Sequence, residues 1–370
     1  YTCFAACLSC GYPVAVIDPA AGPRELDLML RKSAPSALFA DDKVLQRLAE
    51  GQQHILPKNV WRVSAVASEV AVAQPEATGP DSLVSDFPSL EELDQAGTTS
   101  VAVTNRGDMP AYIIFTSGTT SDPKAVVVSR RALRHHVATL SRIFGYGREA
   151  RLLHYLPTHH TDGLVHGVAA SLFTGMTVVH PGLFDASADL EHALGTNEIS
   201  HFLVVPAMLT IIRHTYADRA DLFRYGGFRH LISTAGYLDA KFWAEFETFF
   251  GVRVSNFYGM TETVSGSLYC GPDDETHRIG TVGVPVDADV RIVDDHGSVL
   301  PVDQVGELQV SGAHLMREYL NDPEATRESI VDGWLTTGDL FLQDADGFFH
   351  IVGRKKNVIK RGGITVYPED

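Results

Sequence analysis

The chain has 370 residues, of which 45% are hydrophobic, and carries a formal net charge of -16 from 30 basic and 46 acidic side chains. It is long enough for roughly two or three folding units, and its negative charge argues against a nucleic-acid or anionic-membrane surface, because phosphate groups require clustered Lys and Arg. It has no uncharged apolar run of about 18 residues and no basic-then-apolar leader. We therefore expect a cytoplasmic protein without a membrane span.

Three of the four cysteines lie in the first ten residues. Cys3, Cys7 and Cys10 have the spacing that binds an iron–sulfur cluster in radical enzymes using S-adenosylmethionine. The same positions fall on one face of a helix, where cysteine packs as a small hydrophobe among apolar neighbours. We favour the helix and keep the radical enzyme as an alternative. Cys270 stands alone and suggests no disulfide framework.

Apolar runs typical of buried strands recur along the chain. They cover residues 14–18, 37–41, 111–115, 150–157, 176–181, 201–206, 229–235 and 252–259. Amphipathic segments such as 130–143 and 238–250 separate them, which predicts an α/β fold with largely parallel sheets. Residues 65–110 are polar with little periodicity and predict a surface excursion. After about residue 285, short runs bounded by Gly and Asp predict a small barrel or distorted sheet.

Residues 112–124, YIIFTSGTTSDPK, run from a strand into a hydroxyl-rich turn that closes on Lys124. Such a turn points backbone N–H groups into a concavity that favours an anion, and the lysine adds a mobile point charge. The spacing excludes a P-loop NTPase, which needs Gly, four residues and then Gly-Lys-Ser/Thr. A polar surface turn is the plain alternative. Taken alone, the segment does not decide between a polyphosphate site and such a turn.

The strand and turn at 254–263 offer groups that suit a nucleotide. Tyr258 has a flat ring for stacking on a purine, and Asn256 has an amide for the purine's edge. Thr261 has a hydroxyl for phosphate, and Glu262 has a hard oxygen ligand for Mg²⁺. Each residue alone fits an ordinary core or surface position, so the prediction depends on their spacing.

Two later segments fit the same ligand. Asp339, in TTGDL, lies in a tight turn where a carboxylate can accept both hydroxyls of a ribose. Residues 353–363, GRKKNVIKRGG, are rich in charge, and by themselves are typical of a solvated linker.

Together these segments resemble the adenylate-forming superfamily of acyl-CoA synthetases, peptide-synthetase adenylation domains and beetle luciferases. FTSGTTSDPK resembles the family's phosphate loop, NFYGMTE its adenine and magnesium segment, TGD its ribose site and GRKKNVIKRGG its interdomain hinge, all in the family's order. ACLSCGYPVAVIDPA, at 6–20, is similar to the segment that precedes the phosphate loop. That similarity weakens the iron–sulfur alternative.

The resemblance implies an α/β fold of two packed, largely parallel sheets with flanking helices and a small distorted β-barrel. The sheets, with the ATP and acyl sites, would span 1–285, the barrel 286–354, and the hinge and the start of a small C-terminal domain 355–370. The remainder of that domain, which carries a lysine that assists adenylation in the family, is expected to lie outside this chain. We therefore expect the fragment to bind ATP or an acyl-adenylate and to catalyse adenylation poorly.

The resemblance also implies a two-step reaction on a small carboxylic acid. The carboxylate attacks the α-phosphorus of ATP and releases pyrophosphate. The acyl-adenylate then passes its acyl group to a thiol, either of coenzyme A or of a carrier protein's phosphopantetheine. Because two anions must meet in the first step, neutralisation by Lys124, the loop's N–H groups and Mg²⁺ would be the protein's main contribution.

By the same resemblance, residues of this chain take the family's roles. The catalytic residues would be Lys124, Thr261, Glu262 and His160, the Mg²⁺ ligands Thr116 and Glu262, and the hinge Lys356. Residues 233–236 and Tyr258 would sandwich the adenine. The nucleotide site would comprise Thr116, Ser117, Gly118, Thr119, Thr120, Ser233, Ala235, Gly236, Asn256, Tyr258, Gly259, Thr261, Asp339 and Arg354.

The acyl pocket depends on LPTHHTDG, in which His160 matches an aromatic or histidine gate of acyl- and aryl-CoA synthetases. The next position, where α-amino-acid-activating domains keep an aspartate, is Thr161, so an α-amino acid is disfavoured. Asp162 follows, and whether it turns inward to meet a more distant amine stays open. The pocket would comprise His160, Thr161, Val205, Ser233, Gly259, Met260 and Val264.

Two features weigh against the simplest assignment. Ser121 and Ala125 occupy loop positions that the family usually fills with glycine, which keeps a non-catalytic nucleotide-binding relative as an alternative. The histidines at 154, 159, 160 and 166 could suggest a metal site, but no carboxylate or cysteine completes a familiar ligand set.

Overall fold

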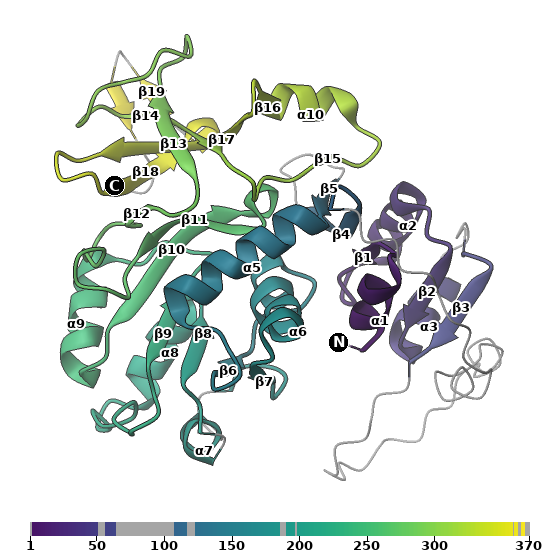
Figure 1. Cartoon of the computed structure of the whole chain (residues 1–370), viewed down its shortest axis with the longest axis horizontal. Helices are drawn as coiled ribbons and strands as arrows, with labels where there is room; N and C mark the ends of the chain where they lie inside the picture. Colours follow the sequence, from purple (N-terminus) through teal and green to yellow (C-terminus); the bar gives the residue numbers. More distant parts are fainter. Residues whose placement is uncertain are drawn as a thin grey trace. The chain divides into compact units, whose positions relative to one another are not determined.

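The computed structural model describes residues 2–50, 56–63, 107–116, 123–185, 190–196, 198–357, 359–361 and 364–366. They form two compact units, residues 1–127 and 128–370 (Figure 1). No helix in the described part of the chain has the length and hydropathy needed to cross a bilayer.

The first unit alternates short helices and strands. Its elements are α1 (Thr2–Cys10), β1 (Val14–Val16), α2 (Pro23–Ser33), β2 (Ala37–Ala40), α3 (Asp42–Glu50), β3 (Asn59–Arg62) and β4 (Pro110–Thr116), followed by β5 (Lys124–Ser129), in which the unit ends. β1 pairs in parallel with β4, and β2 with β3. Leu26 and Leu30 of α2 pack with Ala21 and Leu48 into a small core.

The helix predicted for the three N-terminal cysteines is confirmed. Cys3, Cys7 and Cys10 lie on α1 as half-buried free thiols. The described residues contain no group of three His, Cys, Asp or Glu side chains placed to hold a metal. The iron–sulfur alternative therefore finds no support.

The second unit is built on a seven-stranded sheet in the order β12-β11-β10-β9-β8-β6-β7. The strands are β6 (Arg151–His154), β7 (Thr177–Val179), β8 (His201–Val204), β9 (His230–Ser233), β10 (Val254–Met260), β11 (Ser265–Cys270) and β12 (Val284–Pro285). Five neighbouring strands pair in parallel, in the order β7-β6-β8-β9-β10. β11 pairs antiparallel with β10, and β12 pairs antiparallel with β11. All four residues of β8 are buried, as expected for a parallel strand covered on both faces.

One helix precedes the parallel strands of this sheet in the chain, and the others connect them. They are α5 (Arg130–Phe144), the π-helix η1 (Gly163–Ala169), α6 (Ala170–Thr174), α7 (Leu190–Thr196), α8 (Pro206–Thr215) and α9 (Ala240–Phe250). α5 begins where the Ser129 side chain accepts a hydrogen bond from Ala132 N, and it ends at Gly145, whose φ is 68°. It runs across the sheet in Figure 1, and its Phe144 ring lies 6.2 Å from the ring of Tyr269 on β11.

A second, antiparallel sheet follows residue 285. It comprises β13 (Asp289–Val293), β14 (Gly306–Ser311), β16 (Ile330–Val331), β17 (Trp334–Gln343) and β18 (Phe349–Arg354). β15 (Glu318–Tyr319) and α10 (Pro323–Ser329) lie between β14 and β16, and η3 (Lys355–Asn357), β19 (Ile359–Arg361) and β20 (Ile364–Val366) close the chain. Leu308, Phe341 and Phe349 share one buried cluster with Tyr258 and Leu268 of the seven-stranded sheet.

The predicted fold class is confirmed: largely parallel sheets with helices are followed by a small distorted antiparallel sheet. All eight predicted strand segments contain a strand, and helices occupy both named amphipathic segments. The domain limits at 285 and 355 stay predictions. The polar segment 65–110 lies almost entirely outside the described residues.

Gly283, which precedes β12, allows a close approach of two backbone segments. Its φ is +80°, and a Cβ there would lie 1.8 Å from the carbonyl oxygen of Tyr269. Gly297 has the same φ but nothing within 4 Å of the corresponding point. We expect Gly283→Ala to lower the free energy of unfolding by about 3 kcal/mol or more, and Gly297→Ala by about 1 kcal/mol, because only the first adds a backbone collision. Urea unfolding of both variants measures this, and equal losses would contradict the described approach.

Candidate active site

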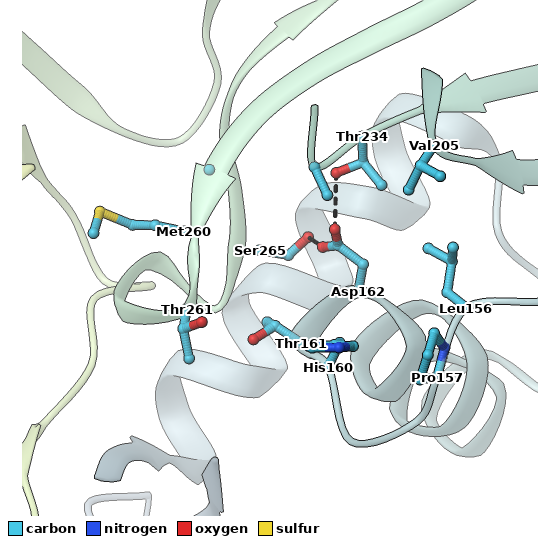
Figure 2. Close-up of a pocket in the computed structure, with 12 residues that line it drawn as sticks. Leu156, Pro157, His160, Thr161, Asp162, Val205, Thr234, Met260, Thr261 and Ser265 are labelled. Atoms are coloured by element: carbon cyan, nitrogen blue, oxygen red, sulfur yellow. Dashed lines mark hydrogen bonds between the residues drawn. The ribbon is translucent and has the colours of Figure 1, made fainter. Parts of the chain in front are cut away.

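A cavity of about 300 Å³ opens in the second unit, where several parallel strands end (Figure 2). The register aligns His154 of β6 with Leu203 of β8, Val204 with Ser233 of β9, and Ser233 with Asn256 of β10. The segments that leave these strands therefore meet at one edge of the sheet, the usual ligand position in α/β folds. The lining residues are Leu156, Pro157, His160, Thr161, Asp162, Val205, Thr234, Ala235, Gly259, Met260, Thr261 and Ser265.

Eight residues from the predicted sites line this cavity. They are His160, Thr161, Val205, Thr234, Ala235, Gly259, Met260 and Thr261. Ser233 and Val264, also predicted, are fully buried and do not line it, and Gly236 is exposed beside it.

The predicted sets omitted four lining residues. Leu156, Pro157 and Asp162 belong to the segment LPTHHTDG that the sequence had already singled out, whereas Ser265 carried no signal. Ser265 reaches the cavity because the chain reverses after β10 and returns as the antiparallel strand β11. Gly259 makes this close return possible, since a Cβ there would lie 1.3 Å from the Ser265 carbonyl oxygen.

Asp162 lies between two strands at the centre of the cavity wall. Its Oδ2 accepts a hydrogen bond of 2.8 Å from the Thr234 hydroxyl, and its Oδ1 accepts one of 2.6 Å from the Ser265 hydroxyl (Figure 2). Asp162 immediately precedes the π-helix η1, an irregularity often found at functional sites. Burial raises the pKa of its carboxyl, and the two hydroxyl donors oppose that rise.

Behind Ser265 lies a buried pair of aromatic side chains. The Ser265 Oγ lies 3.4 Å from Nε2 of His166, whose Nδ1 lies 2.8 Å from the Tyr146 hydroxyl. Burial lowers the pKa of His166 to about 3, so its imidazole is neutral near pH 7. Burial raises the pKa of Tyr146, which keeps its phenol protonated.

Glu262 lies in the 3-10 turn η2 (Thr261–Thr263) that follows β10. It is buried, with 7% of its surface exposed, and its Oε1 accepts a hydrogen bond of 2.7 Å from the Tyr319 hydroxyl. Within the described part of the chain no donor contacts Oε2. A single fixed carboxylate with an available oxygen fits Mg²⁺, which proteins often hold through one or two carboxylates and the phosphates of a nucleotide.

Asp339, Tyr258 and Arg354 meet as a second polar group. The Tyr258 hydroxyl donates to Oδ2 of Asp339 at 2.7 Å, and Nε of Arg354 lies 2.7 Å from Oδ1. The antiparallel register of β17 and β18 places Asp339 opposite Arg354. Burial raises the pKa of Tyr258, so the phenol stays a donor. These three predicted nucleotide residues are thus in direct contact.

Asn256 and Ser233 face each other across β10 and β9. The Oδ1 of Asn256 and the Oγ of Ser233 are buried, and neither has a hydrogen-bond partner among the described residues. Buried polar atoms are rarely left unpaired in a protein. An amide and a hydroxyl in this state suit the polar edge of a purine.

The remaining predicted residues lie in the first unit or near the end of the chain. The Thr116 hydroxyl, at the end of β4, donates to the Lys124 carbonyl oxygen at 3.4 Å. Ala125 is buried within β5, in a strand and not in the turn. Lys356 is exposed in η3. Ser117, Gly118, Thr119, Thr120 and Ser121 lie outside the described residues.

The chain is similar to known proteins in sequence and in fold. A family model described as "AMP-binding enzyme" matches residues 1–320. Sulfoacetate–CoA ligase of Cupriavidus necator is 31% identical over 98% of this chain and 67% of its own length. Oxalate–CoA ligase of Arabidopsis thaliana is 29% identical over 82% of this chain and 59% of its own length. The crystal structure of ATP-bound MatB from Rhodopseudomonas palustris superposes with a TM-score of 0.84 at 26% identity, covering 99% of this chain and 68% of that one.

The buried His166 makes stability depend on pH. An unfolded histidine takes up a proton near pH 6.5, whereas folded His166 does so only near pH 3. Between these values the unfolded state binds more protons, so the free energy of unfolding falls as pH is lowered, by up to about 1.4 kcal/mol per pH unit. We expect the free energy of unfolding of His166→Gln to fall less steeply than that of the wild-type protein between about pH 6 and pH 4.5. Urea unfolding over that range measures it.

His214→Gln is the matched control, because His214 is exposed on α8. This variant should keep the slope of the wild-type protein. An unchanged slope in His166→Gln would contradict the assignment of a neutral, buried imidazole.

Proposed function

Because this chain belongs to the family of AMP-binding enzymes, we propose that the intact protein activates a small carboxylic acid with ATP and transfers the acyl group to coenzyme A. The observation that carries the proposal is the cavity at the carboxyl ends of β6, β8, β9 and β10, which Thr261 lines beside Glu262. The chain spans between 59% and 68% of the length of the proteins compared above, so the activity is assigned to the intact protein. The relatives' names favour coenzyme A over a carrier protein as the acceptor.

In the first step a carboxylate oxygen of the acid attacks the α-phosphorus of ATP. The bond from that phosphorus to the bridging oxygen breaks, and pyrophosphate leaves. Two anions approach each other, so hydrogen-bond donors and cations that meet the developing charge lower the barrier. Thr261 is assigned to the α-phosphate, and Lys124 supplies a mobile positive charge. Glu262 would hold Mg²⁺, which would supply further neutralisation.

The nucleoside would be held by residues of β10 and of the strands β9, β17 and β18. The Asp339 carboxylate, already fixed by Tyr258 and Arg354, is assigned to the ribose hydroxyls. Asn256 and Ser233 present buried polar atoms to the adenine. Several fixed groups orient the α-phosphorus before the attack, so little entropy is lost during the reaction itself.

In the second step the thiolate of coenzyme A attacks the acyl carbon, and AMP leaves with the electron pair of the broken bond. His160 is exposed at the mouth of the cavity and is assigned as the gate through which the acyl group is reached. Lys356 is assigned as the hinge residue.

The carboxylate of Glu262 tests this proposal. In the intact protein we expect Glu262→Gln to lower acid-dependent pyrophosphate release by roughly 100-fold, because the amide removes the charge and keeps the shape. Lys124→Ala should cause a loss of similar size. Measuring pyrophosphate release against a panel of aliphatic, aromatic and amino acids provides the assay.

Glu328→Gln on α10 provides the control, because Glu328 is exposed and makes the same change of charge. Its activity should equal that of the wild-type protein. An intact protein that binds ATP but releases no pyrophosphate with any acid in the panel would be a non-catalytic binder, and the proposal would be wrong.

A further inference from the structure

The wall of the cavity carries a negative charge that no cation in the wall offsets. We infer that the acid which enters this cavity bears an ammonium group distant from the carboxylate it activates, and that Asp162 binds this ammonium. The inference rests on the proposed function, since it names the substrate class of the same site. Three observations carry it: the two hydroxyl donors that face Asp162, the absence of a cationic partner, and unused acceptor capacity.

The hydrogen bonds around Asp162 all point toward it. The Tyr146 phenol has His166 Nδ1 as its only acceptor among the described residues, so the phenol donates and the imidazole proton lies on Nε2. Nε2 then faces the Ser265 oxygen, and the Ser265 hydroxyl is left to donate to Asp162. Thr234 donates to the other carboxylate oxygen. An ionised carboxylate is acceptor-only, so it can receive one such donor on each oxygen.

No cation in the wall balances this carboxylate. The residues that line the cavity include no Lys or Arg. In the described part of the chain Asp162 forms no salt bridge, and its two hydrogen bonds come from neutral hydroxyls. His160 lines the same cavity and interacts with Asp162 electrostatically, but it is exposed at the mouth and donates no hydrogen bond to it. A charge taken out of water without a partner is costly, so a cationic ligand would offset that cost.

Acceptor capacity remains for such a ligand. A carboxylate accepts about four hydrogen bonds, and two of those positions are filled by Thr234 and Ser265. The Thr161 hydroxyl lies in the same wall, buried and without a hydrogen-bond partner among the described residues. An ammonium has three donors and no acceptor, which matches a wall of this kind. A second carboxylate or a sulfonate would instead be repelled by Asp162.

The position of the charge sets the substrate class. The position after His160, where an α-ammonium would be recognised in amino-acid-activating relatives, is Thr161 and carries no charge. Asp162 is one residue further along and points between β9 and β11, toward Thr234 and Ser265 (Figure 2). The ammonium is therefore placed on the body of the acid, away from the reacting carboxylate.

A panel of matched acids tests the inference on the intact wild-type protein. Pyrophosphate release is compared across the ω-amino acids from 3-aminopropionate to 6-aminohexanoate, each against its methyl, hydroxyl and carboxylate counterpart of equal length. We expect at least one amino acid to exceed all three counterparts in kcat/KM by roughly 30-fold or more, since a buried charge pair is broken in each of them. A protein that prefers the methyl, hydroxyl or dicarboxylate member would overturn the inference.

The role of Asp162 is tested with Asp162→Asn, which keeps the shape and removes the charge. We expect it to reduce the preference for the amino acid to less than about 3-fold, mainly through KM, because the ion pair to the ground-state ligand is lost. Asp218→Asn is the control, because Asp218 is an exposed aspartate in the same unit and its substitution changes the net charge equally. It should keep the full preference. A preference that survives Asp162→Asn would mean that another group binds the ammonium.

The two proposals fail in different ways. Absence of pyrophosphate release with every acid would overturn the proposed function and leave no substrate class to assign. Release with methyl or dicarboxylate acids alone would keep the proposed function and overturn the ammonium inference. The wild-type panel decides this even where a variant folds poorly.

Discussion

The site depends on one constraint of parallel sheets, namely that neighbouring strands end at the same edge. The pairing of neighbouring strands keeps β6, β8, β9 and β10 in register. The segments that leave them therefore converge, although Leu156 and Met260 lie 104 positions apart in the chain. Loops at this edge can carry polar side chains because the core of the sheet already buries the apolar ones. The cavity is thus a consequence of topology, and the residues in the loops decide its chemistry.

Around that edge the protein arranges hydrogen-bond donors by means of neutral, buried groups. His166 is kept uncharged by burial, and together with Tyr146 it fixes the direction in which the Ser265 hydroxyl points. The same principle appears at Asp339, which accepts from Tyr258, and at Glu262, which accepts from Tyr319. In each place a phenol holds a carboxylate in one orientation, directly or through a relay. Preorganised groups of this kind cost little reorganisation during a reaction.

Much of the fold could be predicted from the sequence, because buried parallel strands form continuous apolar runs such as 201–206. The helix at α5 was predictable for a similar reason: its apolar face, the Ser129 cap and Gly145 are all local signals. Ser265 could not be predicted as a cavity residue. A serine after a 3-10 turn has no distinctive pattern, and only the reversal of the chain at Gly259 brings it to Asp162.

By itself, then, the sequence determined the fold class and the family, because strand periodicity and loop chemistry are local properties of the chain. Only the tertiary structure decided which side chains contact one another and which line the cavity. It brought Tyr258, Asp339 and Arg354 into contact from three strands, and it withdrew Ser233 and Val264 from the cavity wall. It also turned Asp162 into a carboxylate that neutral donors surround, because burial and hydrogen-bond direction arise only when separate strands pack together.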